Sequence, residues 1–332
     1  MPKDIECAVA PDFPIIDVHH HLWDESFGLA ENFGRFLPQD FVSEVEESGH
    51  RLIGSVYGDC GFAFRDNGPE EFRCVGETEY VEQVAEHFSR NRGAAGKVAC
   101  GIIARANLMM GDAVGPVLDA HREASPKRFK GIRELLAYDP EVFRALNIPQ
   151  HKSRLPAFRS GVLQLARRGL ILEVLGVHPM LDDIVDLAHA FPEVSIVLNH
   201  FGYPIGIGRF HGQRAAVFDD WRSKISALAR CENITIKLSG VGAEVPGFGW
   251  FGGGAPARSV DVATVIEPYV TAAIDAFSPA RCMFASNFPV DKASFSYGTL
   301  WNAFKRVAAR YSLEEQHMLF HANATRIYRL EL

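Results

Sequence analysis

The sequence lacks the features that mark several classes of protein. Its six cysteines include no CxxC pair, so reduced core thiols are favoured over a disulfide framework. No stretch approaches the ~18 uninterrupted apolar residues of a membrane span. Acidic residues outnumber basic ones by 41 to 34, and the resulting net charge of −7 argues against a general nucleic-acid or membrane surface.

Signals that would divide or export the chain are also missing. We find no internal repeat, low-complexity tract or linker, and the first residues, MPKDIECAVAPDF, make a poor signal peptide. A cytoplasmic location is therefore the default expectation. A single domain over residues 1–332 is expected, because α/β barrels commonly reach this length and 47% hydrophobic residues can fill a large core.

Short apolar segments alternate with segments of helical spacing along the whole chain. Strands are predicted at 14–21, 51–59, 98–106, 129–135, 170–178, 194–200, 234–240 and 281–287. Helices are predicted at 78–91, 155–169, 181–191, 215–230 and 297–311, and Ser312 with Glu315 forms a capping-box pattern for a last one. The pattern predicts the α/β class, as a single (β/α)8 TIM barrel. An open doubly wound sheet is the alternative, but it usually has fewer strands.

Two predicted connections are long, at roughly 59–76 and 240–259. The second contains PGFGWFGGGAP but lacks the GK[ST] ending of a phosphate-binding loop. A mobile lid or surface loop at the C-terminal rim of the barrel is therefore favoured over phosphate binding.

Three adjacent histidines end the first predicted strand. Residues i and i+2 of a strand share a face. Strict alternation therefore places His19 and His21 in the barrel lumen with Ile15 and Asp17, and turns Ile16, Val18, His20 and Leu22 toward the helices. Two imidazoles on one face can ligate one metal ion. No chemistry is assigned to His20.

Two further histidines strengthen a pattern that is weak alone. His178 ends the fifth predicted strand and His200 ends the sixth. The C-terminal ends of barrel strands form the rim where active sites are built, so these side chains are expected to meet His19 and His21 there. The other histidines lie in predicted helices or loops, where surface or core roles are favoured.

Several motifs resemble the amidohydrolase superfamily, and more narrowly its amidohydrolase-2 branch of TIM-barrel hydrolases, which includes lactone hydrolases. The specific matches are DVHHHLWD, LNHFGYP and FASNFPVDK, and the likeness extends through GPEEFRCVGETEYV, FKGIREL, NITIKLSG and NATRIYRL. This resemblance implies one divalent metal ion, zinc in the first instance, bound by His19, His21, His178 and His200. Some relatives in this branch are thought to work without metal, so metal-free catalysis is left open.

The eighth strand departs from the family pattern. Asn287 stands where the family usually has an aspartate that binds the metal or takes a proton from water. An amide can orient water but cannot accept a proton at neutral pH. Asp291 and Asp59 are therefore the candidate bases, with a capping or loop role as the alternative for each.

Other side chains of the predicted rim are candidates for substrate binding. Arg133 and Lys237 interrupt apolar strands and are able to hold an anionic substrate, although ion pairs inside the barrel would also explain them. Lys130 and Arg105 are weaker choices. Trp23 forms an apolar wall or simply packs.

The sequence favours a hydrolase that opens a small cyclic ester, or acts on a related carboxylated substrate, through a metal-polarised carbonyl and bound water. A lactone demands less of a site without the usual aspartate than an amide does. A metal-dependent decarboxylase of an aromatic or unsaturated acid and a non-catalytic ligand-binding barrel are the alternatives. A small molecule is the expected partner, without nucleic acid or membrane, and self-association through the helices is left open.

Overall fold

Eight parallel strands form one sheet in the order of the chain. The computed structural model describes residues 6–90, 96–253 and 257–332. The strands are β1 (Ile15–His20), β2 (Leu52–Gly58), β3 (Lys97–Ala104), β4 (Phe129–Leu135), β5 (Ile171–Leu175), β6 (Ile196–Asn199), β7 (Ile234–Leu238) and β8 (Cys282–Phe284). Just beyond β8, Asn287 donates its backbone N–H to the His19 carbonyl at 2.8 Å and brings the last strand back to the first. Each predicted strand is confirmed.

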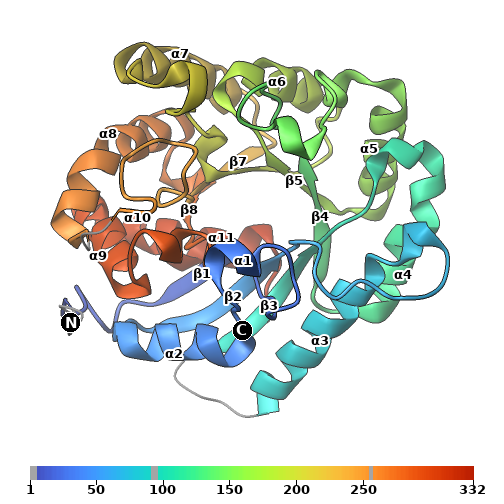
Figure 1. Cartoon of the computed structure of the whole chain (residues 1–332), viewed down its shortest axis with the longest axis horizontal. Helices are drawn as coiled ribbons and strands as arrows, with labels where there is room; N and C mark the ends of the chain where they lie inside the picture. Colours follow the sequence, from blue (N-terminus) through green and yellow to red (C-terminus); the bar gives the residue numbers. More distant parts are fainter. Residues whose placement is uncertain (1–5, 91–95, 254–256) are drawn as a thin grey trace.

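Helices surround the sheet on its outside (Figure 1). They are α1 (Ala30–Phe33), α2 (Pro38–Ser48), α3 (Val75–Arg90), α4 (Gly115–Ala124), α5 (Pro156–Arg168), α6 (Leu181–Ala190), α7 (Arg214–Ala229), α8 (Ser259–Phe277), α9 (Tyr297–Ala308), α10 (Leu313–His317) and α11 (Asn323–Ile327). The predicted capping box is present, since the Ser312 hydroxyl and the Glu315 carboxylate each accept the other residue's backbone N–H. The (β/α)8 barrel predicted from the sequence is confirmed.

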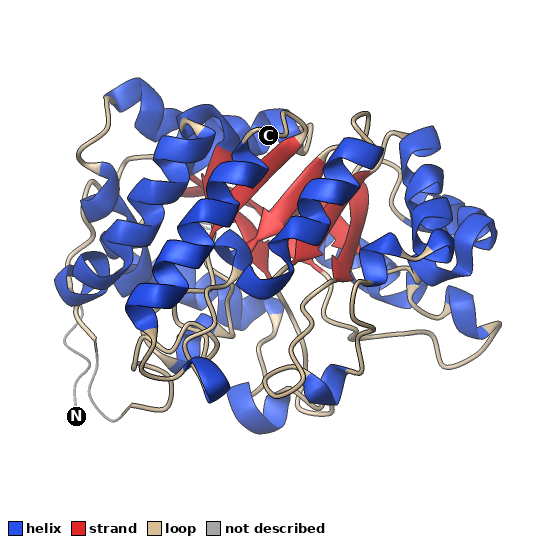
Figure 2. Ribbon diagram, turned by 90° about the horizontal axis from the view of Figure 1, so that it is seen from above, coloured by secondary structure: helices blue, strands red, loops and turns tan. Residues whose placement is uncertain are grey.

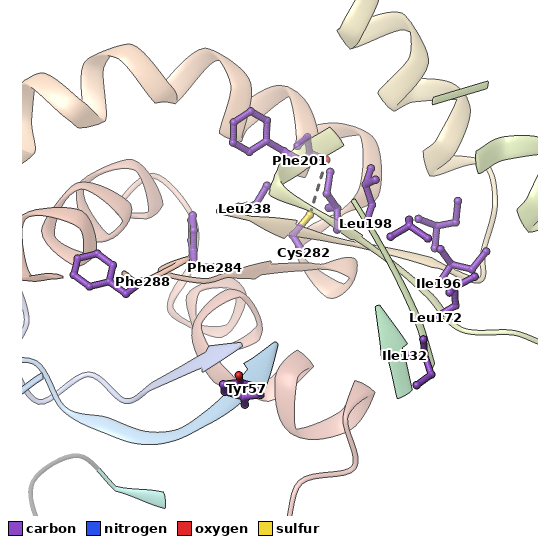
Figure 3. Packing of buried hydrophobic residues seen from close by; sticks show 14 of the residues in the cluster. Tyr57, Ile132, Leu172, Ile196, Leu198, Phe201, Leu238, Cys282, Phe284 and Phe288 are labelled. Carbon is purple, nitrogen blue, oxygen red and sulfur yellow. Dashed lines mark hydrogen bonds between the residues drawn. The ribbon is translucent and has the colours of Figure 1, made fainter. Parts of the chain in front are cut away.

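The larger part of the hydrophobic core lies between the strands and the helices. Alternate strand residues such as Leu172, Leu198 and Ile236 are fully buried there, and Figure 3 shows part of this layer. Each fully buried leucine side chain contributes roughly 1.5–3 kcal/mol relative to an exposed one. This layer holds the strands in fixed positions, and the ends of those strands carry the polar groups described below.

A second hydrophobic cluster fills the barrel lumen. It contains Ile16 and Val18 of β1 together with Val56 of β2 and Val197 of β6. Residues of strands so far apart in the barrel can only meet inside it. Tyr328, in the segment that follows α11, belongs to the same cluster, so the end of the chain closes one end of the lumen.

The strict alternation predicted for β1 is wrong in its first half. Ile16 and Val18 face the lumen, whereas Asp17 points outward and accepts a hydrogen bond from Tyr297 of α9 at 3.0 Å. The cause is a register shift: Asp17 pairs with Ser55 and His20 with Tyr57, so β1 carries one extra residue. This bulge reverses the parity, and His19 and His21 reach the lumen side as expected.

Long loops gather at the end of the strands opposite the C terminus (Figure 2). The loop after β2 is held by Glu77 of α3, whose carboxylate accepts the backbone N–H groups of Cys60 and Gly61. Burial raises the pKa of Glu77 to about 6. In the loop after β7, residues 254–256 lie outside the described residues, so its role as a lid stays a prediction.

Two expectations from composition can be compared with the fold. All six cysteines are free thiols, and four of them are buried, as predicted. Among the described residues, none of the helices is both long and apolar enough to span a membrane.

Candidate active site

Three of the four predicted histidines lie together at the loop-bearing end of the barrel. The ring centroid of His19 is 4.9 Å from that of His21 and 4.7 Å from that of His200, which directly follows β6. All three side chains are buried. Residues from the first and sixth strands thus meet at one place in the lumen.

The Nδ1 atoms of His21 and His200 each lie within hydrogen-bond distance of one partner. The His21 Nδ1 lies 2.8 Å from the Gly58 carbonyl, so this nitrogen carries the proton and Nε2 keeps its lone pair. The His200 Nδ1 lies 2.9 Å from the Ser239 hydroxyl. Burial lowers the pKa of His19, His21 and His200 well below the ordinary histidine value. The cluster is therefore a set of neutral imidazoles at neutral pH.

The backbone around His200 is closely packed. His200 has a φ of 51°, in the left-handed region, and Tyr203 stacks on its ring at 5.0 Å. Gly240 follows β7 with a φ of +71°, and a Cβ there would lie 2.4 Å from the Tyr203 hydroxyl. Only glycine fits this position, because a Cβ there would also lie 2.8 Å from the His200 ring.

His178 lies apart from this cluster. Its Nδ1 accepts the Ile205 backbone N–H at 3.1 Å, and its ring packs against Phe210. Burial lowers the pKa of His178 to about 4. Within the described part of the chain, its hydrogen bonds and ring contacts do not include the other three histidines, and its role as a ligand stays a prediction.

Cationic groups lie beside both ring nitrogens of His19, and only one of these nitrogens accepts a hydrogen bond in a neutral ring. The Lys237 ammonium lies 3.2 Å from Nδ1, and the Arg133 guanidinium lies 3.0 Å from Nε2. Lys237 is fully buried and bonds both carboxylate oxygens of Glu173, so it forms the ion pair inside the barrel that the sequence left as its alternative role. Burial lowers the pKa of Lys237.

Two guanidinium groups share the carboxylate of Asp59. Arg105 donates to it at 2.7 Å, and the Nε of Arg133 lies 3.2 Å from its other oxygen. The Arg105 side chain is 39% exposed, whereas Asp59 is buried. This group of three charges carries a net positive charge and faces solvent through Arg105, so it is suited to an anion. Asp59 is held as a counter-ion, which leaves it a poor candidate for the base.

Asn287 and Asp291 form a pair after β8. The Asn287 amide donates to one carboxylate oxygen of Asp291 at 2.8 Å, and the Gly242 backbone N–H donates to the other at 2.8 Å. Burial nevertheless raises the pKa of Asp291 to about 7, and the nearby charge of Asp17 adds to the effect. Asp291 is therefore able to exchange a proton near neutral pH.

Trp23 packs beside the histidines. It is fully buried, its indole N–H donates to the Gly34 carbonyl at 2.7 Å, and its ring lies 6.2 Å from that of His21. The side chain anchors the loop after β1 and stands against one side of the cluster.

Some residues of the site gave little signal in the sequence. Tyr203 lies within the LNHFGYP motif and Ser239 directly follows the seventh strand, but neither position identifies which ring it contacts. The sequence favours Arg133 over Arg105 for substrate binding, and the structure places both beside Asp59. The partners of Glu173 depend on three other strands and the chain end.

Sequence comparison places the chain in a family. A family model described as Amidohydrolase matches residues 16–330. The chain belongs to the amidohydrolase family. Membership supports a hydrolase, and the resemblance read from the motifs is confirmed.

The relatives of this amidohydrolase differ in sequence identity and in how much of each chain they cover. An uncharacterized protein of Sinorhizobium fredii, y4mH, is 32% identical over 96% of this chain and 99% of its own length. An L-fucono-1,5-lactonase of Burkholderia multivorans is 31% identical over 52% of this chain and 56% of its own. A crystal structure of an amidohydrolase from Burkholderia multivorans with bound zinc covers 96% of this chain and all of that one at 22% identity, with a TM-score of 0.71.

The donors described for this amidohydrolase do not fit a divalent ion as they stand. Both ring nitrogens of His19 face cationic groups, and Asp59 and Glu173 are each paired with cations. Over residues 6–90, 96–253 and 257–332, no three His, Cys, Asp or Glu side chains are grouped so as to hold a metal. Zinc is bound in the crystal structure of that relative, and the binding of zinc by His19, His21, His178 and His200 of this chain stays a prediction from the sequence.

Proposed function

We propose that this amidohydrolase opens a small lactone by adding water to its carbonyl. The observation that supports this proposal is the group at the mouth of the barrel: neutral imidazoles beside a cationic pair of arginines, with a buried carboxyl group of pKa about 7 after β8. The L-fucono-1,5-lactonase relative, which matches half of the chain, supports a cyclic ester as the substrate.

The proposed roles follow from the contacts of each side chain. Arg133, held between Asp59 and His19, donates N–H groups to the carbonyl oxygen as negative charge develops on it. The ionised Asp291 takes a proton from the attacking water, and Asn287 orients that carboxylate through its amide N–H. The tetrahedral intermediate then releases the ring oxygen, which takes the proton back from Asp291. The product is the open hydroxy acid.

Asn287 favours hydrolysis over decarboxylation. Loss of carbon dioxide from an aromatic acid leaves a carbanion that needs a proton donor. Asn287 occupies the eighth-strand position and its amide does not supply that proton at neutral pH, so a decarboxylase would have to take it from the protonated form of Asp291. Hydrolysis needs only that a base be present, and Asp291 is suited to that role.

A panel of lactones tests the proposal against its alternatives. Purified protein is mixed with sugar lactones, simple aliphatic lactones and aromatic carboxylic acids, and both proton release and carbon dioxide are measured. Proton release with at least one lactone is expected, without carbon dioxide. Carbon dioxide from an aromatic acid would show a decarboxylase, and binding without turnover of any compound would show a ligand-binding barrel.

The rate is expected to depend on the ionisation of Asp291. Because burial raises its pKa to about 7, kcat/KM should rise as pH increases through about 7 and reach a plateau above it. The measurement is a series of initial rates from pH 5 to pH 9, about two units on either side. A rate that is flat across this range, after correction for spontaneous lactone opening, would count against Asp291 as the base.

Metal removal is expected to leave activity unchanged. Because the cations of Arg133 and Lys237 lie beside the two ring nitrogens of His19, a divalent ion would have to displace one of them to bind there. Protein dialysed against a chelator should keep its kcat, and added zinc should not raise it, with metal content measured by elemental analysis. Stoichiometric zinc together with loss of activity on its removal would restore the metal-assisted mechanism.

A further inference from the structure

A buried polar network joins the end of the chain to the histidine cluster. Tyr328 follows α11 and lies in the lumen, where its hydroxyl donates to Glu173 of β5 at 2.5 Å. Both side chains are fully buried. The contact lies below the active site, on the side of the lumen that the C-terminal segment closes.

Glu173 has a partner for each of its oxygens besides Tyr328. The Lys237 ammonium donates at 2.7 and 2.8 Å, and the Asn199 amide donates to one oxygen at 2.8 Å. A buried carboxyl group with this many donors is held in one orientation. Removing one donor would let the remaining ones pull the carboxylate toward themselves.

Lys237 transmits the position of Glu173 to the histidines. Its ammonium has three N–H groups for four acceptor atoms: both oxygens of Glu173, the Val18 carbonyl at 2.7 Å and His19 Nδ1 at 3.2 Å. Because the bond to His19 is the longest, it is the first to be lost if the ammonium moves. The orientation of His19, and with it the contact to Arg133, depends on this balance.

We infer that Tyr328 is a positioning residue for the active site, acting through Glu173 and Lys237 on the orientation of His19. The kinetic tests of this inference rest on the proposed function, whereas the test of His19 orientation does not. The ring of Tyr328 also lies 5.4 Å from the Lys237 ammonium, so Tyr328→Phe keeps this cation–π contact and removes the hydroxyl alone.

A double-mutant cycle tests the inference. Tyr328→Phe should lower kcat by about tenfold and leave KM unchanged, because substrate contacts are untouched while His19 is misaligned. Glu173→Gln should lower kcat at least as much, and adding Tyr328→Phe to it should cause no further loss. Independent, multiplicative losses in the double variant would overturn the pathway through Glu173.

The matched control is Tyr57→Phe. Tyr57 is also fully buried and donates to a glutamate, Glu77, at 2.8 Å, but it lies among the residues outside the lumen. Tyr57→Phe should lower the free energy of unfolding, measured by urea titration, by about as much as Tyr328→Phe does. Its kcat should stay that of the wild type. An equal fall of kcat in this control would show that Tyr328→Phe acts by general destabilisation.

A measurement without substrate separates this inference from the proposed function. Nitrogen resonances of isotope-labelled histidine are recorded for the wild type and Tyr328→Phe, with His19 assigned by its absence in His19→Gln. The His19 Nδ1 signal should move in Tyr328→Phe, whereas that of His121, bonded to Thr78 and the Arg105 carbonyl, should not. An unmoved His19 signal would overturn the inference even if the protein is a lactonase.

Discussion

Replacing Asp291 by asparagine is expected to lower kcat for lactone opening by about a thousandfold, within the range for loss of a general base. The amide keeps the size of the side chain and one acceptor for the Asn287 and Gly242 donors, but it cannot take a proton. KM should change little, because Asp291 is proposed to act on water. Steady-state kinetics at pH 8 measure both constants.

The same substitution should change how stability depends on pH. The folded pKa of Asp291, about 7, lies above its ordinary value of 3.8, so the unfolded chain releases this proton first. Stability from Asp291 is thus fully present below 3.8 and is lost as pH rises through about 7. The decline over this interval should be smaller in Asp291→Asn, as measured by urea unfolding.

Asp183→Asn is the control for Asp291→Asn. Asp183 is a buried carboxylate of α6 that pairs with Arg154 and His151, outside the histidine cluster. Its replacement should cost stability and leave kcat unchanged. If Asp291→Asn kept more than about a tenth of the wild-type kcat, Asp291 would not be the base, given the usual effect of general-base catalysis.

Replacing Arg133 by methionine is expected to lower kcat/KM by about a hundredfold, as for loss of a donor to a developing oxyanion. The change removes the guanidinium that contacts both His19 and Asp59. The substitution should also lower the free energy of unfolding by about 2 kcal/mol. This is less than the cost of breaking a buried ion pair completely, because Arg105 still neutralises Asp59.

Arg133→Lys separates charge from geometry. Lysine keeps the positive charge beside Asp59 but lacks the planar fork that contacts two partners at once. Stability should therefore return to near the wild-type value while most of the activity stays lost. Full activity in Arg133→Lys, or in Arg133→Met, would show that this arginine serves only as a counter-ion of Asp59.

The barrel could be predicted because its signals are local. Each strand carries a short, mainly apolar run, and the helices between them show their own spacing, so the order of β1 to β8 follows from the chain. The bulge in β1 could not be predicted. It depends on how Asp17 and His20 pair with Ser55 and Tyr57, and nothing in IIDVHH marks the extra residue.

The positions of His19, His21 and His200 at the rim could be predicted from the strand ends, whereas the separation of His178 and the contacts between side chains could not. His19, His21 and His200 follow from the rule that barrel sites form at those ends. The cations on both nitrogens of His19 do not, because they come from β4 and β7, whose positions relative to β1 depend on the closed barrel. The contact between Tyr328 and Glu173, which lie 155 positions apart in the sequence, could not be predicted for the same reason.

Lactone opening in heavy-oxygen water tests the central claim most directly. Wild-type protein, freed of metal by a chelator, is incubated with the best lactone of the panel, and the product is analysed by mass spectrometry alongside the Asp291→Asn variant. The account predicts one labelled oxygen in the carboxylate of the hydroxy acid, formed by the wild type and almost not at all by the variant. Label in the hydroxyl group, turnover that needs metal, or equal product from both proteins would contradict it.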